Sequence, residues 1–139
     1  MENIKEKIEA IKKSADMVLL ITNTIEAYPR PRIMQKLDEE KDGCIWFATS
    51  KKSRKIQEIE IDPVVTVYFV NSKNNDTSIV AGEASMLNDD ETKKHFWRDT
   101  WTKYWPEGVE SEDYVLIRIE PSHGECVGGE SSDTGEIDY

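Results

Sequence analysis

The segment "TSKKSRK", residues 49 to 55, gathers the side chains of this chain that are best suited to binding a small anion. It holds four basic residues and three hydroxyl groups: Lys51, Lys52, Arg54 and Lys55, with Thr49, Ser50 and Ser53. A guanidinium can bind two phosphate oxygens at once, an ammonium supplies a point charge, and a helix N-terminus adds free backbone N–H groups. The segment therefore predicts a site for a phosphate monoester, with Ser53, Arg54 and Lys55 as its main donors.

The charge balance of the whole chain makes this basic segment unusual. The chain has 18 Lys and Arg against 28 Asp and Glu, a formal net charge of -10. Residues 30 to 55 nevertheless carry a net +4, from eight basic and four acidic residues, so that the remainder carries -14. This balance argues against nucleic acid or an anionic membrane as a partner. A short basic run that stands alone is more often a solvated loop, but charge confined to this window favours a compact anion, and Arg30 or Arg32 could close its site.

Metal-binding and targeting patterns do not occur in this sequence. The two cysteines and two histidines show no metal-ligand spacing, so we expect no metal site and an inert thiol at Cys126. The amino terminus is charged throughout and lacks an unbroken apolar run, which fits neither a signal peptide nor a membrane span. We therefore expect a cytoplasmic protein.

The hydrophobic pattern predicts the elements that must position the basic segment. Apolar residues at helical spacing predict an amphipathic helix over the first fifteen residues. Runs of apolar, β-branched and aromatic residues predict strands at 17–23, near 32–37, and at 44–50, 64–70, 77–87 and 114–121. A short helix is expected from an N-cap at Ser53 to Asp62, which precedes Pro63. Short strands with few helices predict a mainly β protein, a small antiparallel barrel with helices outside it.

Two further predictions concern the second half of the chain. A helix capped by Asn88 or Asp89 is expected to run to Pro106, and it would place four aromatic residues on one stripe: Trp97, Trp101, Tyr104 and Trp105. Such a stripe is more often core or subunit packing than a ligand contact. Residues 1–123 are expected to form a single domain, and residues 124–139, which are polar and rich in glycine, a flexible tail.

The order of these motifs resembles the pyridoxamine 5'-phosphate oxidase-like superfamily of FMN-binding split β-barrels, in particular its general stress protein branch. The resemblance rests on "IWFATSKKSRKIQEIEIDPVVTVYF", which is an aromatic strand, a threonine, a basic loop, Ser-Arg-Lys, and Asp-Pro before a β-branched strand. It continues in "AGEASML" and in "FWRDTWTKYWPEGVESEDYVLIRIEP", and it covers roughly residues 5 to 121.

The resemblance implies a homodimer with an FMN site at each side of the dimer interface. Ser53, Arg54 and Lys55 match the segment that holds the FMN phosphate, and Thr49 and Ser50 match the strand end beside the ribityl arm. Arg32, Ile33 and Met34 match the strand along the flavin ring. Trp105 is a candidate to approach the ring from the partner subunit. No Asp, Glu or His falls beside these positions in a way that nominates a general acid or base, so the catalytic residues are unknown.

The implied function is that of a small FMN-dependent oxidoreductase. The vitamin-making oxidases of the superfamily carry a carboxy-terminal Arg and His for the substrate phosphate, whereas this chain has no Arg after Arg118 and an isolated His123. A true pyridoxamine phosphate oxidase is therefore not expected. The alternatives are a non-catalytic flavin protein for storage, sensing or stress protection, and a split barrel that binds haem or a deazaflavin instead.

Overall fold

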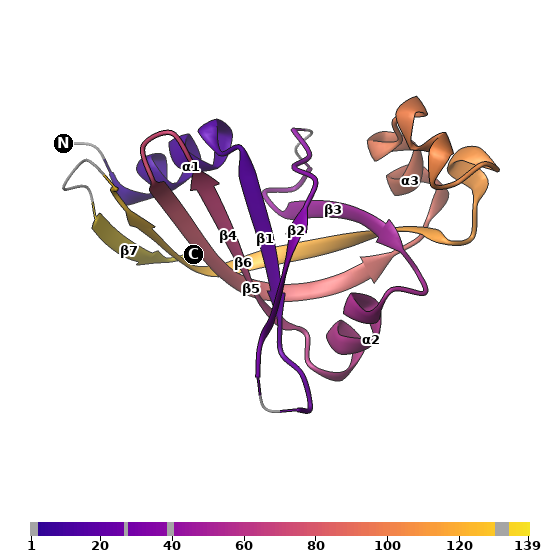
Figure 1. Cartoon of the computed structure of the whole chain (residues 1–139), viewed down its shortest axis with the longest axis horizontal. Helices are drawn as coiled ribbons and strands as arrows, with labels where there is room; N and C mark the ends of the chain where they lie inside the picture. The colour runs from indigo at the N-terminus through magenta and orange to yellow at the C-terminus, as the bar shows by residue number, and fades with distance from the viewer. Residues whose placement is uncertain (1–2, 27, 39–40, 130–133) are drawn as a thin grey trace.

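Seven antiparallel strands form one curved sheet in the computed structural model, which describes residues 3–26, 28–38, 41–129 and 134–139 (Figure 1). The strands are β1 (Met17–Thr22), β2 (Arg30–Met34), β3 (Ile45–Ser50), β4 (Val64–Asn71), β5 (Asp76–Leu87), β6 (Tyr114–Val127) and β7 (Thr134–Asp138). They follow the order β2-β1-β4-β5-β6-β3, and β7 pairs with β6.

Short helices lie around this sheet. In the described ranges they are α1 (Ile4–Ser14), α2 (Arg54–Ile61), α3 (Asp90–Phe96) and the 3-10 turns Asp99–Lys103 and Gly108–Glu110. The predicted fold class, a mainly β protein with peripheral helices, is confirmed. No helix among the described residues is long and apolar enough to cross a membrane.

The sheet curls into a barrel that is split between β2 and β3. These two strands stand at opposite ends of the strand order, and among the described strands no backbone ladder joins them. Alternating side chains of β1 and β4 point inward, so that Val18, Leu20, Val65 and Val67 are buried. Ile8 of α1 joins the same core from outside the sheet. The split leaves two strand edges facing each other, and both carry predicted site residues.

The helix α2 forms where the sequence predicts it. Ser53 is its N-cap residue in extended conformation, although its side chain makes no capping hydrogen bond. Asp62 ends the helix by donating its backbone N–H to the carbonyl of Glu58, just before Pro63. Because α2 follows β3 directly, the basic loop is fixed between a strand end and the first turn of a helix.

Close strand packing explains the glycine of the "AGEASML" segment. The register between β5 and β6 shifts at Ala81 and Gly82. A Cβ on Gly82 would lie 2.4 Å from the carbonyl oxygen of Glu120, a distance that no side chain tolerates. The irregularity in the ladder therefore requires glycine at this position.

The predicted helix from residue 89 to Pro106 is wrong in its second half. Asp89 caps α3 by accepting the N–H of Thr92, but the helix ends at Phe96, and Trp97 turns into an extended conformation. A 3-10 turn from Asp99 to Lys103 follows. The rings still cluster: Trp101 lies 6.0 Å from Trp105 and 5.8 Å from Tyr114 between ring centroids. Packing onto β6 therefore decides the backbone path in this segment, against its helical spacing.

The sheet also continues into the predicted tail. β6 runs on to Val127, and β7 pairs with it from His123↔Asp138 to Val127↔Thr134. Residues 124–127 and 134–138 of the expected tail thus lie in strands of the sheet, and residues 130–133 lie outside the described residues. Gly124 and Gly135 allow this pairing to pack against α1, since a Cβ at either would meet Ile8 or Ile4.

Candidate functional site

An open cleft of about 580 Å³ lies at the split in the barrel, between the edges of β2 and β3. Its walls come from β2, β3, the first turn of α2, and the aromatic segment before β6. The lining residues are Ile33, Met34, Gln35, Ala48, Thr49, Ser50, Lys55, Trp101, Tyr104, Trp105 and Asp113. The cleft therefore brings together six of the nine predicted site residues and leaves out Arg32, Ser53 and Arg54.

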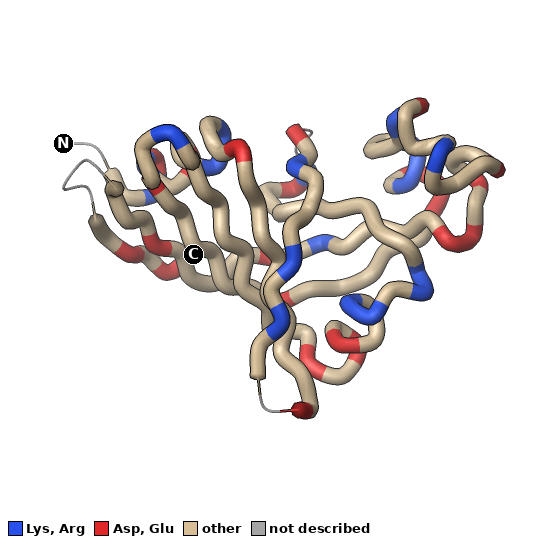
Figure 2. The backbone as a smooth tube through the Cα atoms, in the orientation of Figure 1, with Lys and Arg blue, Asp and Glu red and all other residues tan. Residues whose placement is uncertain are grey.

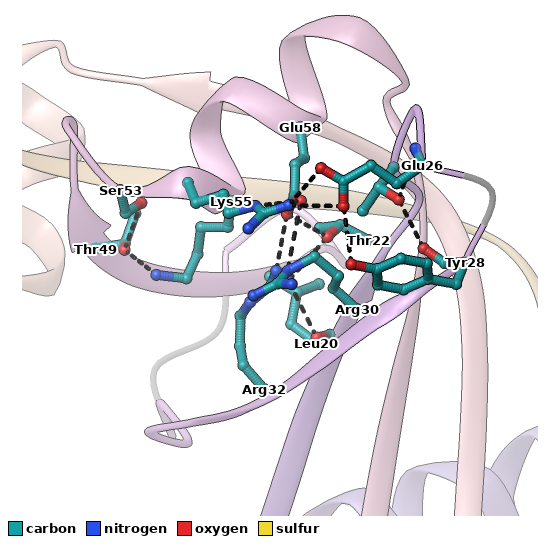
Figure 3. A network of polar contacts seen from close by, with 12 residues as sticks. Leu20, Thr22, Glu26, Tyr28, Arg30, Arg32, Thr49, Ser53, Lys55 and Glu58 are labelled. Atoms are coloured by element: carbon teal, nitrogen blue, oxygen red, sulfur yellow. Dashed lines mark hydrogen bonds and ion pairs between the residues drawn. The ribbon is translucent and has the colours of Figure 1, made fainter.

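Lys55 supplies the positive charge of this cleft. Its Nζ donates to the hydroxyl of Thr49 at 2.8 Å, and the Thr49 and Ser53 hydroxyls are 3.5 Å apart (Figure 3). Burial of the ammonium, and then the charge of Arg32, lower the pKa of Lys55 from its ordinary value. No carboxylate in the described residues forms an ion pair with Lys55. A half-buried ammonium without a carboxylate, beside two hydroxyls, is suited to an anion.

Glu58 is the carboxylate that the arginines near the basic loop contact. This carboxylate is only 7% exposed and accepts hydrogen bonds from Arg32 and Thr22 at 2.8 Å each (Figure 3). Arg54 Nε donates to it at 3.1 Å, and Arg30 Nε lies 3.7 Å away. Burial acts to raise the pKa of Glu58, but the Thr22 hydrogen bond and the Arg32 charge outweigh it, so that the pKa lies below its ordinary value. Glu58 is therefore ionised, and it holds Arg32 and Arg54 in place by hydrogen bonds.

Arg54 points away from Lys55. Its Nη2 also lies 3.2 Å from both carboxylate oxygens of Glu26, so the guanidinium joins two acidic side chains. It lines a separate cleft between α2 and the β1–β2 hairpin, with Asn23, Glu26 and Gln57. Successive residues of a helix point about 100° apart, and residues four apart share one face. The helix geometry thus directs Arg54 to Glu58 and leaves Lys55 facing the cleft.

Both arginines of β2 point toward Glu58. The sequence left open whether Arg30 or Arg32 faces the predicted anion site; Arg32 is committed to Glu58 and Thr22, while the Nε of Arg30 is buried with no hydrogen-bond partner. Ile33 points to the other side of β2 and is 70% exposed at the cleft. Of the residues of β2, Ile33 and Met34 line the cleft.

Asp113 is a cleft residue that the sequence reasoning missed. The Ser50 hydroxyl donates to it, at 2.7 and 2.8 Å from its two carboxylate oxygens, and Trp105 Nε1 donates at 3.2 Å. The hydrogen bond from Ser50 holds the pKa of Asp113 below its ordinary value. The sequence does contain a signal: antiparallel pairing of residues 45–50 with 114–119 places the residue before Tyr114 beside the end of β3.

One wall of the cleft is aromatic, and we call its residues, Trp101, Tyr104 and Trp105, the aromatic wall. Trp105 is buried against Trp101 and Tyr114, with its indole nitrogen fixed by Asp113. Tyr104 is more exposed and stands at the rim. The sequence suggested that Trp105 reaches a ligand from a partner subunit; in this structure it lines the cleft of its own chain.

A family model described as pyridoxamine 5'-phosphate oxidase like matches residues 1–135 of the chain. Among solved structures, the general stress protein 26 of Bacillus anthracis str. Sterne has a TM-score of 0.78 and 29% identity, over 97% of this chain and 98% of that one. No curated protein matches the chain by sequence.

Two further structures share the fold but differ in the ligand that they are described as binding. An FMN-binding protein from Nostoc punctiforme, related to pyridoxamine 5'-phosphate oxidase, has a TM-score of 0.67 and 12% identity, over 97% of this chain and 94% of that one. A heme-binding protein from Mycobacterium smegmatis has a TM-score of 0.78 and 16% identity, over 99% of this chain and 59% of that one.

Proposed function

Because the chain belongs to the pyridoxamine 5'-phosphate oxidase-like family, we propose that it is an FMN-binding flavoprotein that holds its flavin in the cleft between β2 and β3. The observation that carries this proposal is the half-buried Lys55 ammonium, which faces Thr49 and has no carboxylate partner among the described residues. The FMN-binding neighbour from Nostoc punctiforme supports the same cofactor.

The residues of the cleft fit the two ends of FMN. One end has a cation and hydroxyl donors, which suit a phosphate monoester; the other has Ile33, Met34 and Ala48, with tryptophans beside them, which suit a flat ring. β2 is an edge strand, so its outer backbone groups are not used in a ladder with β3 and are available to the polar edge of a ring. The volume of about 580 Å³ falls in the range of roughly 300 to 1,000 Å³ that is usual for cofactor sites.

The proposed roles at the phosphate end differ from residue to residue. Lys55 binds the phosphate as a point charge, and the hydroxyls of Thr49 and Ser53 donate to its oxygens. The first turn of α2 adds backbone N–H groups that have no acceptor within the helix. Ser50 is committed to Asp113 and acts by orienting that carboxylate. Arg54 would have to leave Glu58 and Glu26 to reach the phosphate, so we assign it a secondary role.

The activity that we propose is that of a small FMN-dependent oxidoreductase. When bound, FMN supplies hydride or electron transfer. The protein contributes binding and orientation: the apolar residues and Trp105 exclude water from one side, while the open mouth of the cleft admits a small substrate. His123 contacts Asp138 and does not line the cleft, so it is not placed to bind a substrate phosphate there. A true pyridoxamine phosphate oxidase is therefore not proposed.

We further propose that the chain works as a homodimer in the cytoplasm. Ile33 is 70% exposed at the mouth of the cleft, and Met17 and Val64 are also exposed apolar residues of the sheet. Exposed apolar residues at a ligand site are what a partner subunit would cover. These observations support the dimer.

Haem is the second candidate ligand, because the neighbour from Mycobacterium smegmatis is described as binding it. A haem iron needs an axial His, Cys, Met or Tyr. No His or Cys lines the described part of the cleft, which leaves Met34 and Tyr104. The unpaired Lys55 and its hydroxyl neighbours favour a phosphate, so we place FMN first.

The absorption spectrum of the purified protein tests the cofactor. A flavin spectrum, lost on denaturation with release of FMN, is the expected result; a Soret band or a deazaflavin spectrum would overturn the assignment. Rapid bleaching of the bound flavin by NADH or NADPH would support an oxidoreductase. A flavin that stays oxidised with both nicotinamides and a nitroaromatic panel would instead support storage, sensing or protection.

A further inference from the structure

A second group of chemically capable side chains lies on β6 and β7, away from the cleft. His123 and Glu125 are two residues apart on β6, and Glu136 and Asp138 are two apart on β7. The ladder pairs His123 with Asp138 and Glu125 with Glu136, so all four lie on one face of the two strands. In Figure 1, β7 lies at the opposite end of the sheet from α3, and Figure 2 shows acidic residues along it. We call these four residues the β6–β7 cluster.

The distances in the β6–β7 cluster are close to those of a ligand set. Nitrogen and carboxylate atoms of His123, Glu125 and Glu136 lie within 4.8 Å of one another. The Nε2 of His123 is 3.5 Å from a carboxylate oxygen of Glu136. Two bonds of about 2.0 to 2.2 Å span at most about 4.4 Å, so a small movement of these side chains would bring their ligand atoms onto one ion.

The orientation of His123 is independent support for a metal ligand. Its Nδ1 lies 2.8 Å from Asp138, so this carboxylate fixes the ring and the proton on Nδ1. Nε2 then faces Glu136 at 3.5 Å, where a bound metal ion would replace its proton. A carboxylate that holds one imidazole nitrogen while the other faces a cation site is the usual arrangement behind metal-binding histidines.

The negative charge of the cluster also favours a bound cation. Three carboxylates surround one imidazole, which when protonated can balance only one of them, and no Lys or Arg among the described residues forms an ion pair with any of the three. Carboxylates grouped in this way repel one another unless a positive charge lies between them.

We propose that the β6–β7 cluster binds a divalent transition-metal ion, with His123, Glu125 and Glu136 as ligands and Asp138 as the residue that positions His123. One imidazole with two carboxylates suits Zn²⁺, Mn²⁺ or Fe²⁺ better than Mg²⁺ or Ca²⁺, which prefer all-oxygen sites. The ion would tie the carboxy-terminal strand β7 to β6. The sequence predicted no metal site, because only strand pairing brings residues 123 and 125 next to 136 and 138. This site does not depend on the proposed flavin.

The probe for this site is Zn²⁺, titrated by calorimetry into the full chain after its tag is removed and its metals are stripped with a chelator. One Zn²⁺ per chain is expected, and Mg²⁺ at the same concentration should not compete. His123→Gln and Glu136→Gln should each abolish binding, and Asp138→Asn should weaken it by about 10- to 100-fold. His95→Gln is the matched control for the other exposed histidine, and Lys55→Ala is the control for the cleft; neither should change binding.

A structural role for β7 gives a second measurement. Zn²⁺ should slow amide hydrogen exchange in residues 134–138 of the wild type but not of His123→Gln. The four side chains are at least partly exposed, so the variants should fold, and circular dichroism checks this. If the wild type binds no Zn²⁺, or if His123→Gln binds it as tightly as the wild type, the site does not exist as proposed.

Discussion

Lys55 and Arg54 are neighbours in the sequence, yet their side chains are used differently. Lys55 faces the cleft and contacts Thr49, whereas Arg54 is held by Glu58 and Glu26. Removing Lys55 would therefore take the unpaired charge out of the proposed phosphate site, while removing Arg54 would leave that charge in place.

We expect Lys55→Ala to weaken FMN binding by about 10- to 100-fold, since one charge-assisted hydrogen bond contributes roughly 1.5 to 3 kcal/mol. Arg54→Ala should weaken it less, and Lys51→Ala, in the exposed part of the same loop, should have no effect. Fluorescence titration of the flavin-free protein with FMN measures all three. If Arg54→Ala lost more affinity than Lys55→Ala, the phosphate would be bound on the Glu58 side of α2.

Glu58 is the residue on which the arginines converge. Glu58→Gln should destabilise the fold by about 3 kcal/mol, near the lower end of the range for breaking a buried ion pair, because the arginines keep some contact with water. Chemical denaturation measures this loss. Glu60→Gln, an exposed carboxylate on the same helix, is the control and should change the free energy of unfolding by less than about 0.5 kcal/mol.

The pH dependence of unfolding tests the same residue by another route. The pKa of Glu58 is depressed in the folded chain, so its contribution to stability is fully present above the unfolded value of about 4.3 and is lost as the pH falls through the folded pKa. The destabilisation caused by Glu58→Gln should therefore shrink below about pH 4. A difference between the wild type and Glu58→Gln that stayed constant down to pH 2 would contradict an ionised Glu58.

At the residue scale, the sequence predicted which neighbours in the chain come together at the site, but it missed the contacts between residues that are far apart in the sequence. Thr49, Ser53 and Lys55 lie within one strand–loop–helix unit, so their proximity follows from short-range structure. The partners of Arg32 and of Ser50 do not: Arg32 meets Glu58 across 26 residues, and Ser50 meets Asp113 across 63. Such pairs depend on strand order and register, which the sequence pattern alone leaves undetermined.

At the scale of elements, the aromatic segment between α3 and β6 shows why spacing alone was misleading. Trp97, Trp101 and Trp105 recur every four residues, which predicts one helix, yet the helix ends at Phe96. Their rings pack around Tyr114 of β6 at centroid distances of 5.0 to 5.8 Å. By contrast, β1 and β4 were predicted close to their bounds, because alternating burial directly reflects the period of an extended chain. The second strand was predicted near 32–37 but lies at Arg30–Met34, and β7 was not predicted.

Asp113 connects three elements at the cleft, since it accepts from Ser50 at the end of β3 and from Trp105 in the aromatic wall, just before β6 begins. Asp113→Ala should destabilise the fold by about 1 to 3 kcal/mol, because two donors lose their acceptor. It should also change the tryptophan emission, as Trp105 is released. The exposed neighbour Glu112 is the control, and Glu112→Ala should alter neither measurement; an Asp113→Ala protein with unchanged stability and emission would show that this carboxylate does not tie the elements together.

At the scale of the whole molecule, the sheet separates two kinds of charge. Lys and Arg gather on β2 and in the loop before α2, and Asp and Glu follow β7 at the far end (Figure 2). The net charge of -10 thus hides a basic region in which Glu58 and Glu26 hold the arginines, while Lys55 faces the cleft. The overall composition predicted a compact anion site, but it could not show which cation would face the cleft.

The proposed dimer can be tested together with the proposed flavin site, because Ile33 lies at both. Light scattering should give twice the chain mass of 16.0 kDa for the wild type. Ile33→Glu should shift the protein to monomers, because each copy of Ile33 would lose about 1.5 to 3 kcal/mol of apolar burial and place a charge in the contact. The same variant should lose FMN, whereas Lys55→Ala should only weaken FMN binding and stay dimeric. An Ile33→Glu monomer that kept the affinity of the wild type would mean that one chain completes the flavin site, and the cleft would then be independent of the interface.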